Sequence, residues 1–346
     1  MKLIASAIEL PRRCVTSAEL DTLSGLPQGQ TETSFLIKRR YYADPQGGET
    51  ADYLGASALK QALAEGGLSI EDVDCLIAAC ATSAQAIPYN AASIYRHMGS
   101  DRRIHTFDVG MTCLSFLQAL DVANLYLSSG RYRRVAIVSA DLASVGLNHA
   151  HPEASAIFGD GAVAYIFEAV SVLSWGRSRE DADKLVFGVK SICFETVHQA
   201  YDFCEIRAGG SSRHISQVQD AEALEQFRLD NAFKMDGKRL YRHVLKDFRP
   251  YVDRHLTQLE MTLDDVSLVI PHQASGHGLM HVQRLLEVED ERFFNVFSQY
   301  GNQVAASIPC ALHLARVAGR YKAGDTLLLL GTSAGMSYGS VVVEIR

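Results

Sequence analysis

Apolar segments of strand length alternate with amphipathic, helical segments along the whole chain. This alternation is typical of an α/β fold whose sheet strands are buried on both faces. A further strand is expected at residues 185–195, in a more polar part of the chain. The five clearest buried strands are predicted at residues 75–79, 135–139, 163–167, 268–270 and 327–330.

Start and stop signals mark three of the helices. Thr16 and Glu19 have the spacing of a capping box, which predicts a helix start. The helical pattern over residues 51–64 ends at a pair of glycines, a common C-terminal signal. Leucines on one face predict another helix from Cys113 to residue 128. Cys113 is therefore expected at the N-terminus of a helix.

The second half of the chain repeats features of the first. The segment LSIEDVDCLIAACATS is similar to MTLDDVSLVIPHQAS, and the tripeptide Gly-Arg-Tyr occurs at 130–132 and again at 319–321. The spacing between the two tripeptides equals the spacing between Cys113 and Asn302. This agreement predicts a duplicated βα unit in which Cys113 and Asn302 hold equivalent places.

The duplication divides the chain. We expect an N-terminal half at residues 1–170, which carries Cys113, and a C-terminal half at residues 231–346. The region 171–230 matches nothing in the first half and is more polar. We interpret it as an insertion or connector that helps to shape a substrate entrance.

Composition excludes several classes of function. The chain has 346 residues, 47% of them hydrophobic, and can bury a large core. A formal net charge of −7 argues against nucleic acid as a partner. The first eight residues are mostly apolar but too few for a signal-peptide core, and far fewer than the run of about 20 that spans a bilayer. We expect a cytoplasmic protein without a membrane segment.

The cysteines and histidines do not form an evident metal site. Seven cysteines are scattered, odd in number and without CxxC pairs, which favours free thiols in a reducing compartment. His277 and His281 have a spacing that could seat a metal, but no cysteine or carboxylate stands near them in the sequence. We therefore predict no metal and no resident cofactor.

Three residues are candidates for chemistry. Cys113 at a helix start would have its thiolate favoured by the helix dipole and by free backbone amides. His272 follows an apolar strand, at the edge where α/β folds gather ligands, and Asn302 lies in a turn before a helix. Taken singly, each has an ordinary structural interpretation: a buried core thiol, a hydrogen-bonded histidine and a helix cap.

Six motifs, considered together, change this balance. Through them the chain resembles the ketoacyl-acyl carrier protein synthase III family of the thiolase superfamily over nearly its whole length, because the motifs follow one another in the order typical of that family. The resemblance implies a fold of two duplicated βαβαβαββ halves in a five-layered αβαβα sandwich, a homodimer, and Cys113, His272 and Asn302 as the catalytic residues. The motifs are Asp108 to Phe116, Phe158-Gly159-Asp160-Gly161, Lys234-Met235-Asp236-Gly237, Pro271-His272-Gln273-Ala274, Gly301 to Pro309, and Gly331 to Gly339.

The resemblance implies acyl transfer through Cys113. The thiolate attacks an acyl thioester of CoA or of an acyl carrier protein, and backbone amides of Cys113, Ala334 and Gly335 hold the oxyanion. A malonyl-type thioester then loses carbon dioxide, and His272 and Asn302 donate hydrogen bonds to the resulting enolate. The product is a 3-oxoacyl thioester of fatty acid or polyketide biosynthesis.

Two absences favour decarboxylation over the other reactions of the superfamily. The loop 331–335 lacks the second cysteine that thiolases use as a base, and the stretch 81–90 lacks the acid of hydroxymethylglutaryl-CoA synthases. Two alternatives stay open. One is transfer of the acyl group to an alcohol or amine with His272 as general base. The other is a non-catalytic partner subunit.

The sequence also departs from the family. The positions that grip the CoA adenine in the housekeeping enzymes correspond to Phe35 and Pro152 at the donor entrance, and the only tryptophan, Trp175, lies elsewhere. This puts acetyl-CoA as the donor in doubt. Ile87, expected to reach an acyl pocket across the dimer interface, is smaller than the family's usual phenylalanine and predicts a longer acyl chain. The remaining pocket positions are assigned to Leu114, Phe158 and Ser275.

Two further patterns have plain interpretations. Gly331, Gly335 and Gly339 look faintly like a phosphate loop, but no lysine follows in register, so tight packing beside Cys113 is the better explanation. A basic helix face over residues 234–249 is either simply solvated or docks an acidic carrier protein, as in the family.

Overall fold

The computed structural model describes residues 1–149, 151–170 and 185–346. Its helices follow the amphipathic segments of the sequence. Thr16 accepts a hydrogen bond from the Glu19 N–H (3.2 Å) and so caps the first helix, as predicted. The helices are α1 Ser17–Leu23, α2 Gln30–Phe35, α3 Ala51–Glu65, α4 Asn90–Arg96, α5 Ser115–Ser128, α6 Pro152–Ser155, α7 Ala221–Asp230, α8 Gly237–Thr257, α9 Gly276–Leu286, α10 Phe297–Tyr300 and α11 Ser307–Val317.

The first sheet is built from the N-terminal half and has the order β1-β7-β6-β4-β5. β7 is antiparallel to both of its neighbours, whereas β6, β4 and β5 run parallel. The three predicted strands of this half are all present. The strands are β1 Lys2–Glu9, β4 Cys75–Ala78, β5 His105–Asp108, β6 Arg134–Asp141 and β7 Gly161–Glu168, with a separate hairpin of β2 Arg13–Thr16 and β3 Arg39–Tyr42.

The second sheet repeats this topology. Its order is β11-β12-β13-β8, with β13 antiparallel to both neighbours and β11 parallel to β12. A single bridge between Val269 and Phe293 stands at the fifth place. The matching pattern of directions confirms that the chain consists of two duplicated halves. The strands are β8 Phe187–Thr196, β11 Leu268–Pro271, β12 Thr326–Ser333 and β13 Ser337–Ile345.

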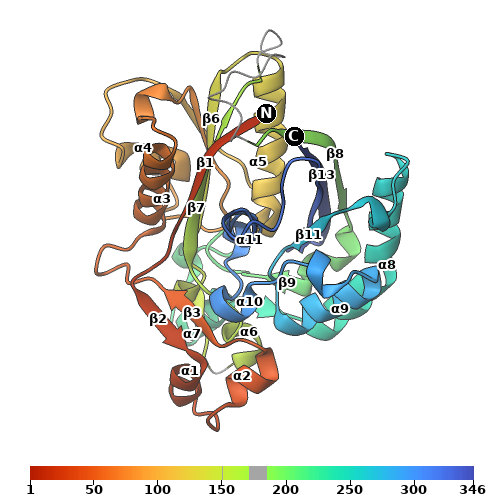
Figure 1. Ribbon diagram of the computed structural model, residues 1–346. Helices are drawn as coiled ribbons and strands as arrows, with labels where there is room; N and C mark the ends of the chain where they lie inside the picture. The colour runs from red at the N-terminus through yellow and green to blue at the C-terminus, as the bar shows by residue number, and fades with distance from the viewer. Residues whose placement is uncertain (150, 171–184) are drawn as a thin grey trace.

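The two sheets and their helices form five layers (Figure 1). Helices α3 and α4 cover the outer face of the first sheet, α5 and α11 lie between the sheets, and α8 and α9 cover the outer face of the second. One apolar core fills each of the three helical layers, and the central one is built around α5 and α11. This is the thiolase-like α/β sandwich expected from the sequence.

The connector 171–230 contributes to the second sheet. Its predicted strand is present as β8, which pairs along its length with β13 and closes one edge of that sheet. The connector also supplies β9 Cys204–Glu205, which pairs with β10 Lys234–Met235. Residues 171–184, with Trp175, lie outside the described residues. The division at residues 170 and 230 stays a prediction.

The register of the duplication differs from the one expected. Ser115 accepts a hydrogen bond from the backbone N–H four residues earlier (2.8 Å), and Ser307 does the same (2.9 Å), so these two serines are equivalent. Cys113 therefore matches Ala305, and the predicted equivalence with Asn302 is wrong. The physical reason is that α5 has 14 residues and α11 only 11. The spacing between the two Gly-Arg-Tyr tripeptides therefore fits the C-terminal ends of these helices but not their N-terminal starts.

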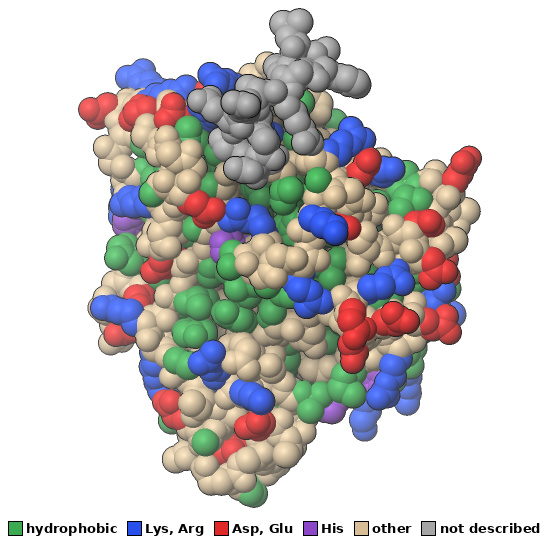
Figure 2. All heavy atoms as spheres, in the orientation of Figure 1, with side chains coloured by type: hydrophobic (Ala, Val, Ile, Leu, Met, Phe, Trp, Pro, Cys, Tyr) green, Lys and Arg blue, Asp and Glu red, His purple; other side chains and the backbone are tan. Residues whose placement is uncertain are grey.

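The surface carries charges of both signs. On the face shown in Figure 2, acidic and basic side chains are interspersed, and apolar side chains gather near the middle of the view. This face offers no broad basic surface to a phosphate backbone. Within the described ranges, no helix has both the length and the apolar character to cross a membrane.

Candidate active site

Cys113 lies where three loops meet at the centre of the fold. It occupies a 3₁₀ turn, Thr112–Leu114, one residue before α5 begins at Ser115. The sequence predicted a helix starting at Cys113 itself, and this boundary is wrong by two residues. The turn packs against β12 and against the second 3₁₀ turn, Val304–Ala306, which follows Asn302.

The backbone is strained at three places around this thiol. Thr112, Val304 and Met336 have φ values of 46°, 52° and 45°, in the left-handed region that favours glycine. Such a conformation costs roughly 1–3 kcal/mol per residue and persists only where the surrounding structure enforces it. Two of the three residues are β-branched, for which this region is least favourable. Strain of this kind collects at functional sites.

The thiol of Cys113 is protonated in the resting protein. Burial, followed by the Asp141 carboxylate and the Cys204 thiol, raises its pKa to about 12. Hydrogen bonds from the backbone N–H groups of Cys113 and Ala334 oppose this shift but do not outweigh it. Burial thus opposes the thiolate that the helix start is expected to favour. These two N–H groups lie beside the sulfur.

His272 follows β11 directly and is only 6% exposed. Its backbone N–H donates to the Leu330 carbonyl of the neighbouring strand (2.8 Å), which continues the sheet up to this residue. Burial lowers the pKa of its imidazole to about 4, so the ring is neutral at physiological pH. Among the described residues, Nδ1 has no hydrogen-bond partner. The ring is therefore neutral and buried, and its Nδ1 makes no hydrogen bond to the described residues.

Asn302 is held by hydrogen bonds at both ends of its side-chain amide. Its Nδ2 donates to the Ala274 carbonyl (3.2 Å), and its Oδ1 accepts from the Val304 N–H (2.9 Å). These contacts fix the orientation of the amide, and no group in the described residues accepts the second Nδ2 hydrogen, which is left for a ligand. The Ala274 N–H in turn donates to the His272 carbonyl (2.9 Å). Asn302 and the His272 segment are thus tied together.

Asp141 is a residue that the sequence analysis missed. It ends β6, is fully buried, and accepts hydrogen bonds from the backbone N–H groups of Ala81 (2.9 Å), Thr82 (2.7 Å) and Ala305 (2.9 Å). One carboxylate therefore joins the loop after β4 to the turn that follows Asn302. A charged residue that closes an otherwise apolar strand was the available signal.

Glycines allow close packing beside the site, as expected. A Cβ at position 331 would lie 2.6 Å from the Cβ of His272, and a Cβ at position 339 would lie 2.9 Å from Leu114. Neither position tolerates a side chain without moving its neighbours. Leu114 itself is fully buried against these glycines. Gly335 has a φ of 80° in the turn after β12, next to Ala334.

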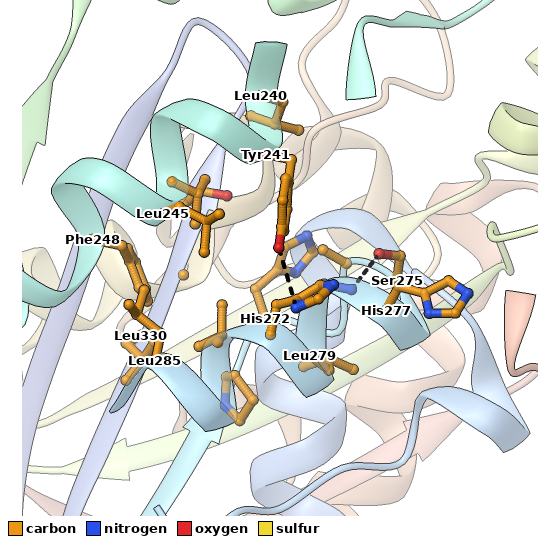
Figure 3. Close-up of a pocket in the computed structure, with 18 of the residues that line it drawn as sticks. Leu240, Tyr241, Leu245, Phe248, His272, Ser275, His277, Leu279, Leu285 and Leu330 are labelled. Atoms are coloured by element: carbon orange, nitrogen blue, oxygen red, sulfur yellow. Dashed lines mark hydrogen bonds between the residues drawn. The ribbon is translucent and has the colours of Figure 1, made fainter. Parts of the chain in front are cut away.

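A cavity of about 380 Å³ opens beside His272, between α8 and α9 (Figure 3). Ser275, one of the predicted pocket residues, lines it and also caps α9, because its Oγ accepts from the Gly278 N–H (3.1 Å). Phe35, at the end of α2, lies at the start of α9, since a Cβ on Gly276 would approach its carbonyl oxygen to 2.9 Å. Phe35 therefore borders the same region as Ser275.

The remaining predicted pocket positions are more scattered. Phe158 is buried against Phe233, with ring centroids 5.0 Å apart, and its backbone forms a bridge with Asn302. Ile87 is 87% exposed in the single chain, in the loop between β4 and α4. Pro152 is the first residue of α6. Phe158 thus adjoins the site, whereas the side chain of Ile87 points into solvent.

The two histidines with metal-like spacing have other contacts. His277 donates to the Ser34 carbonyl (2.9 Å), and His281 lies 3.4 Å from the Tyr241 hydroxyl. In the described part of the chain, no group of histidine, cysteine and acidic side chains is placed to hold a metal ion. All seven cysteines are unpaired.

Comparisons with known proteins agree with this geometry. Residues 107–179 match the family model described as 3-oxoacyl-[acyl-carrier-protein] synthase III, and residues 256–345 match the model of its C-terminal part. The chain is 26% identical over 343 residues to beta-ketoacyl-[acyl-carrier-protein] synthase III of Aquifex aeolicus, covering 99% of both chains. It is 28% identical over 335 residues to the enzyme of the same name from Allorhizobium ampelinum, covering 97% of this chain and 96% of the relative.

A solved structure extends the likeness to three dimensions. The crystal structure of the Aquifex aeolicus synthase III superimposes with a TM-score of 0.81 at 25% identity, over 99% of each chain. The family models cover the segments that carry Cys113, His272 and Asn302, and the structural likeness covers both halves. The chain therefore belongs to the 3-oxoacyl-[acyl-carrier-protein] synthase III family.

Proposed function

We propose that the protein is a condensing enzyme that loads an acyl group from a thioester onto Cys113 and joins it to a malonyl-type thioester, giving a 3-oxoacyl product. It is an acyltransferase of the EC 2.3.1 class, like the relatives named above. One observation carries the proposal: a thiol, a neutral imidazole and an amide lie on three neighbouring segments, because the turn of Cys113 packs on the turn after Asn302, and Asn302 donates to Ala274 beside His272. No cofactor enters the reaction.

The first half-reaction is acyl transfer to the thiol. The sulfur attacks the thioester carbon, the negative charge moves onto the carbonyl oxygen, and the carrier leaves as a thiol. The N–H groups of Cys113 and Ala334 converge near the sulfur and would hold this oxyanion, with Gly335 shaping the turn. Because the resting thiol is protonated, its proton must leave as the attack occurs.

The second half-reaction is decarboxylative condensation. Loss of carbon dioxide leaves negative charge on the thioester oxygen of the malonyl unit, and two neutral hydrogen-bond donors stabilise that charge. His272 is suited to this role because burial keeps it neutral, and Asn302 because one of its amide hydrogens is free. The carbanion attacks the acyl carbon on Cys113, and the thiolate is released.

The surface and the sheet edge support the expected partners. Lys238, Arg242 and Lys246 have exposed side chains on α8, beside the cavity, and form a basic face suited to an acidic acyl carrier protein. CoA is the other possible carrier of the acyl group.

The free edge of the first sheet favours a homodimer. β5 is an edge strand of this sheet, and Ile87 is exposed in the single chain. Free thiols fit a cytoplasmic location.

A direct test of the proposed reaction measures the carbon dioxide that it releases. Purified acyl-enzyme is mixed with ¹⁴C-carboxyl-labelled malonyl thioester, and released carbon dioxide and the 3-oxoacyl product are measured together. Equal amounts of both are expected. An ester or amide formed from an added alcohol or amine, without carbon dioxide, would contradict the proposal and favour the alternative acyl transfer.

The donor is expected to carry a medium-length chain. Ile87 is smaller than phenylalanine, so an acyl pocket that it helps to close across a dimer admits a chain longer than acetyl. We expect octanoyl thioesters to acylate Cys113 at least about tenfold faster than acetyl-CoA, in terms of kcat/KM. Intact-protein mass spectrometry over time measures both rates. Ile87→Phe should reverse the order, and a wild-type preference for acetyl would contradict this prediction.

The low pKa of His272 predicts activity in mild acid. An imidazole with its usual pKa of 6.5 would gain a proton as the pH falls through that value, whereas burial delays protonation of His272 to about pH 4. We expect the condensation rate of preformed acyl-enzyme to stay level down to about pH 5 and to halve near pH 4. Rapid-quench assays with preformed acyl-enzyme give the rate, and far-ultraviolet circular dichroism reports whether the protein stays folded. A fall centred near pH 6.5 would contradict the prediction.

A further inference from the structure

The two carboxylate oxygens of Asp141 hold different segments of the active site. Oδ1 accepts hydrogen bonds from the backbone N–H groups of Ala81 (2.9 Å) and Thr82 (2.7 Å) and from the Thr82 hydroxyl (2.8 Å). Oδ2 accepts from the backbone N–H of Ala305 (2.9 Å). All four partners can donate, which suits an ionised carboxylate that only accepts. One oxygen therefore serves the loop after β4, and the other serves the turn after Asn302.

The contact with Ala305 reaches Asn302 through a single strained turn. Ala305 is the central residue of the 3₁₀ turn Val304–Ala306, and the Val304 N–H donates to the Asn302 Oδ1 (2.9 Å). Val304 is β-branched and has a φ of 52°, which is unfavourable for such a residue. A conformation of this kind persists only where neighbouring contacts enforce it. The hydrogen bond from Ala305 to Asp141 is one such contact, directly after the strained residue.

We infer that Asp141 is a positioning residue for the second half-reaction: it binds the Ala305 N–H and so keeps the turn in the conformation that orients the Asn302 amide. The inference rests on the proposed function, in which Asn302 donates a hydrogen bond to the enolate oxygen. Asp141 acts through the backbone of the turn, because protein donors already occupy both of its oxygens. Acylation instead depends on the N–H groups of Cys113 and Ala334, so the effect of Asp141 falls on condensation.

Asp141→Asn tests the two oxygens separately. An amide offers one oxygen and one NH2 group, and the oxygen is expected to stay with the three donors of Ala81 and Thr82. The NH2 group then faces the Ala305 N–H, and two donors cannot bond to each other. Condensation of preformed acyl-enzyme should fall at least about tenfold, while acylation of Cys113 changes by less than about threefold. Single-turnover rates of the two steps, followed by intact-protein mass and by released carbon dioxide, measure the difference.

A second substitution, Val304→Gly, tests whether the strained turn carries the effect. Glycine adopts a positive φ about as readily as a negative one, so the turn then needs less support from Asp141. The double variant Asp141→Asn with Val304→Gly should condense at least about fivefold faster than Asp141→Asn alone. A general loss of stability would not be repaired in this way, because Val304→Gly removes a partly buried apolar side chain.

Asp21→Asn is the matched control. Asp21 is also fully buried, and its carboxylate accepts from the backbone N–H groups of Gly29 (2.7 Å) and Thr31 (2.8 Å), next to α1. This variant should melt at a lower temperature and keep the ratio of the condensation rate to the acylation rate within about twofold of the wild type.

Three outcomes would overturn the inference. The first is an unchanged condensation rate in Asp141→Asn. The second is an equal loss of acylation and condensation, which would mean that the carboxylate supports the whole site. The third is a double variant that condenses no faster than Asp141→Asn. A wild-type acyl-enzyme that releases no carbon dioxide from malonyl thioester would instead contradict the proposed function itself.

Discussion

Replacing Cys113 with alanine is expected to abolish the acyl-enzyme and to lower condensation by more than about 10⁴-fold, because the nucleophile carries both halves of the reaction. The measurement is intact-protein mass after incubation with a panel of acyl-CoA and acyl-carrier thioesters. Wild-type protein should gain the mass of one acyl group, and the variant should gain none.

Cys310→Ala is the matched control for this experiment. Cys310, like Cys113, has its pKa raised by burial to about 12, but Cys310 is fully buried on α11 within the central core. The control should lose some stability and keep its acyl adduct. If Cys113→Ala still formed an adduct on protein that melts like the wild type, the assignment of the nucleophile would be wrong. An adduct-free wild type would favour a non-catalytic partner subunit.

Removing His272 or Asn302 is expected to separate the two half-reactions. His272→Ala and Asn302→Ala should each still form acyl-Cys113, because the N–H groups near the thiol belong to Cys113 and Ala334. Each should lower decarboxylation and condensation by about 10²- to 10³-fold, the usual effect of removing one donor to a developing oxyanion. Single-turnover mixing of preformed acyl-enzyme with malonyl thioester measures this step alone.

His255→Ala tests whether loss of any buried imidazole has the same effect. Like His272, His255 is almost fully buried and has its pKa lowered by burial, but it contacts Ser340 inside the second core. This control should melt at a lower temperature and keep its condensation rate per folded molecule within about threefold. If acylation fell as far as condensation in His272→Ala, the histidine would serve the first half-reaction, as a general base.

Which elements form was determined by the sequence. The buried strands were predicted from unbroken apolar runs, because a strand covered on both faces shows no polar alternation, and each run appears as a strand of one sheet or the other. The order of the motifs likewise indicated the family and the three candidate residues. These signals are local in the chain, so they can be identified without coordinates.

What the tertiary structure decided depends on contacts between distant segments. The start of α5, the register of the duplication and the place of β8 in the second sheet follow from packing and strand pairing. The protonated state of Cys113 follows from burial and from the nearby Asp141, which no motif marks. The cavity beside His272 exists because the consecutive helices α8 and α9 pack on the second sheet without filling the space between them. Spacing along the chain carries none of this information, because burial and charge proximity arise only when the chain is folded.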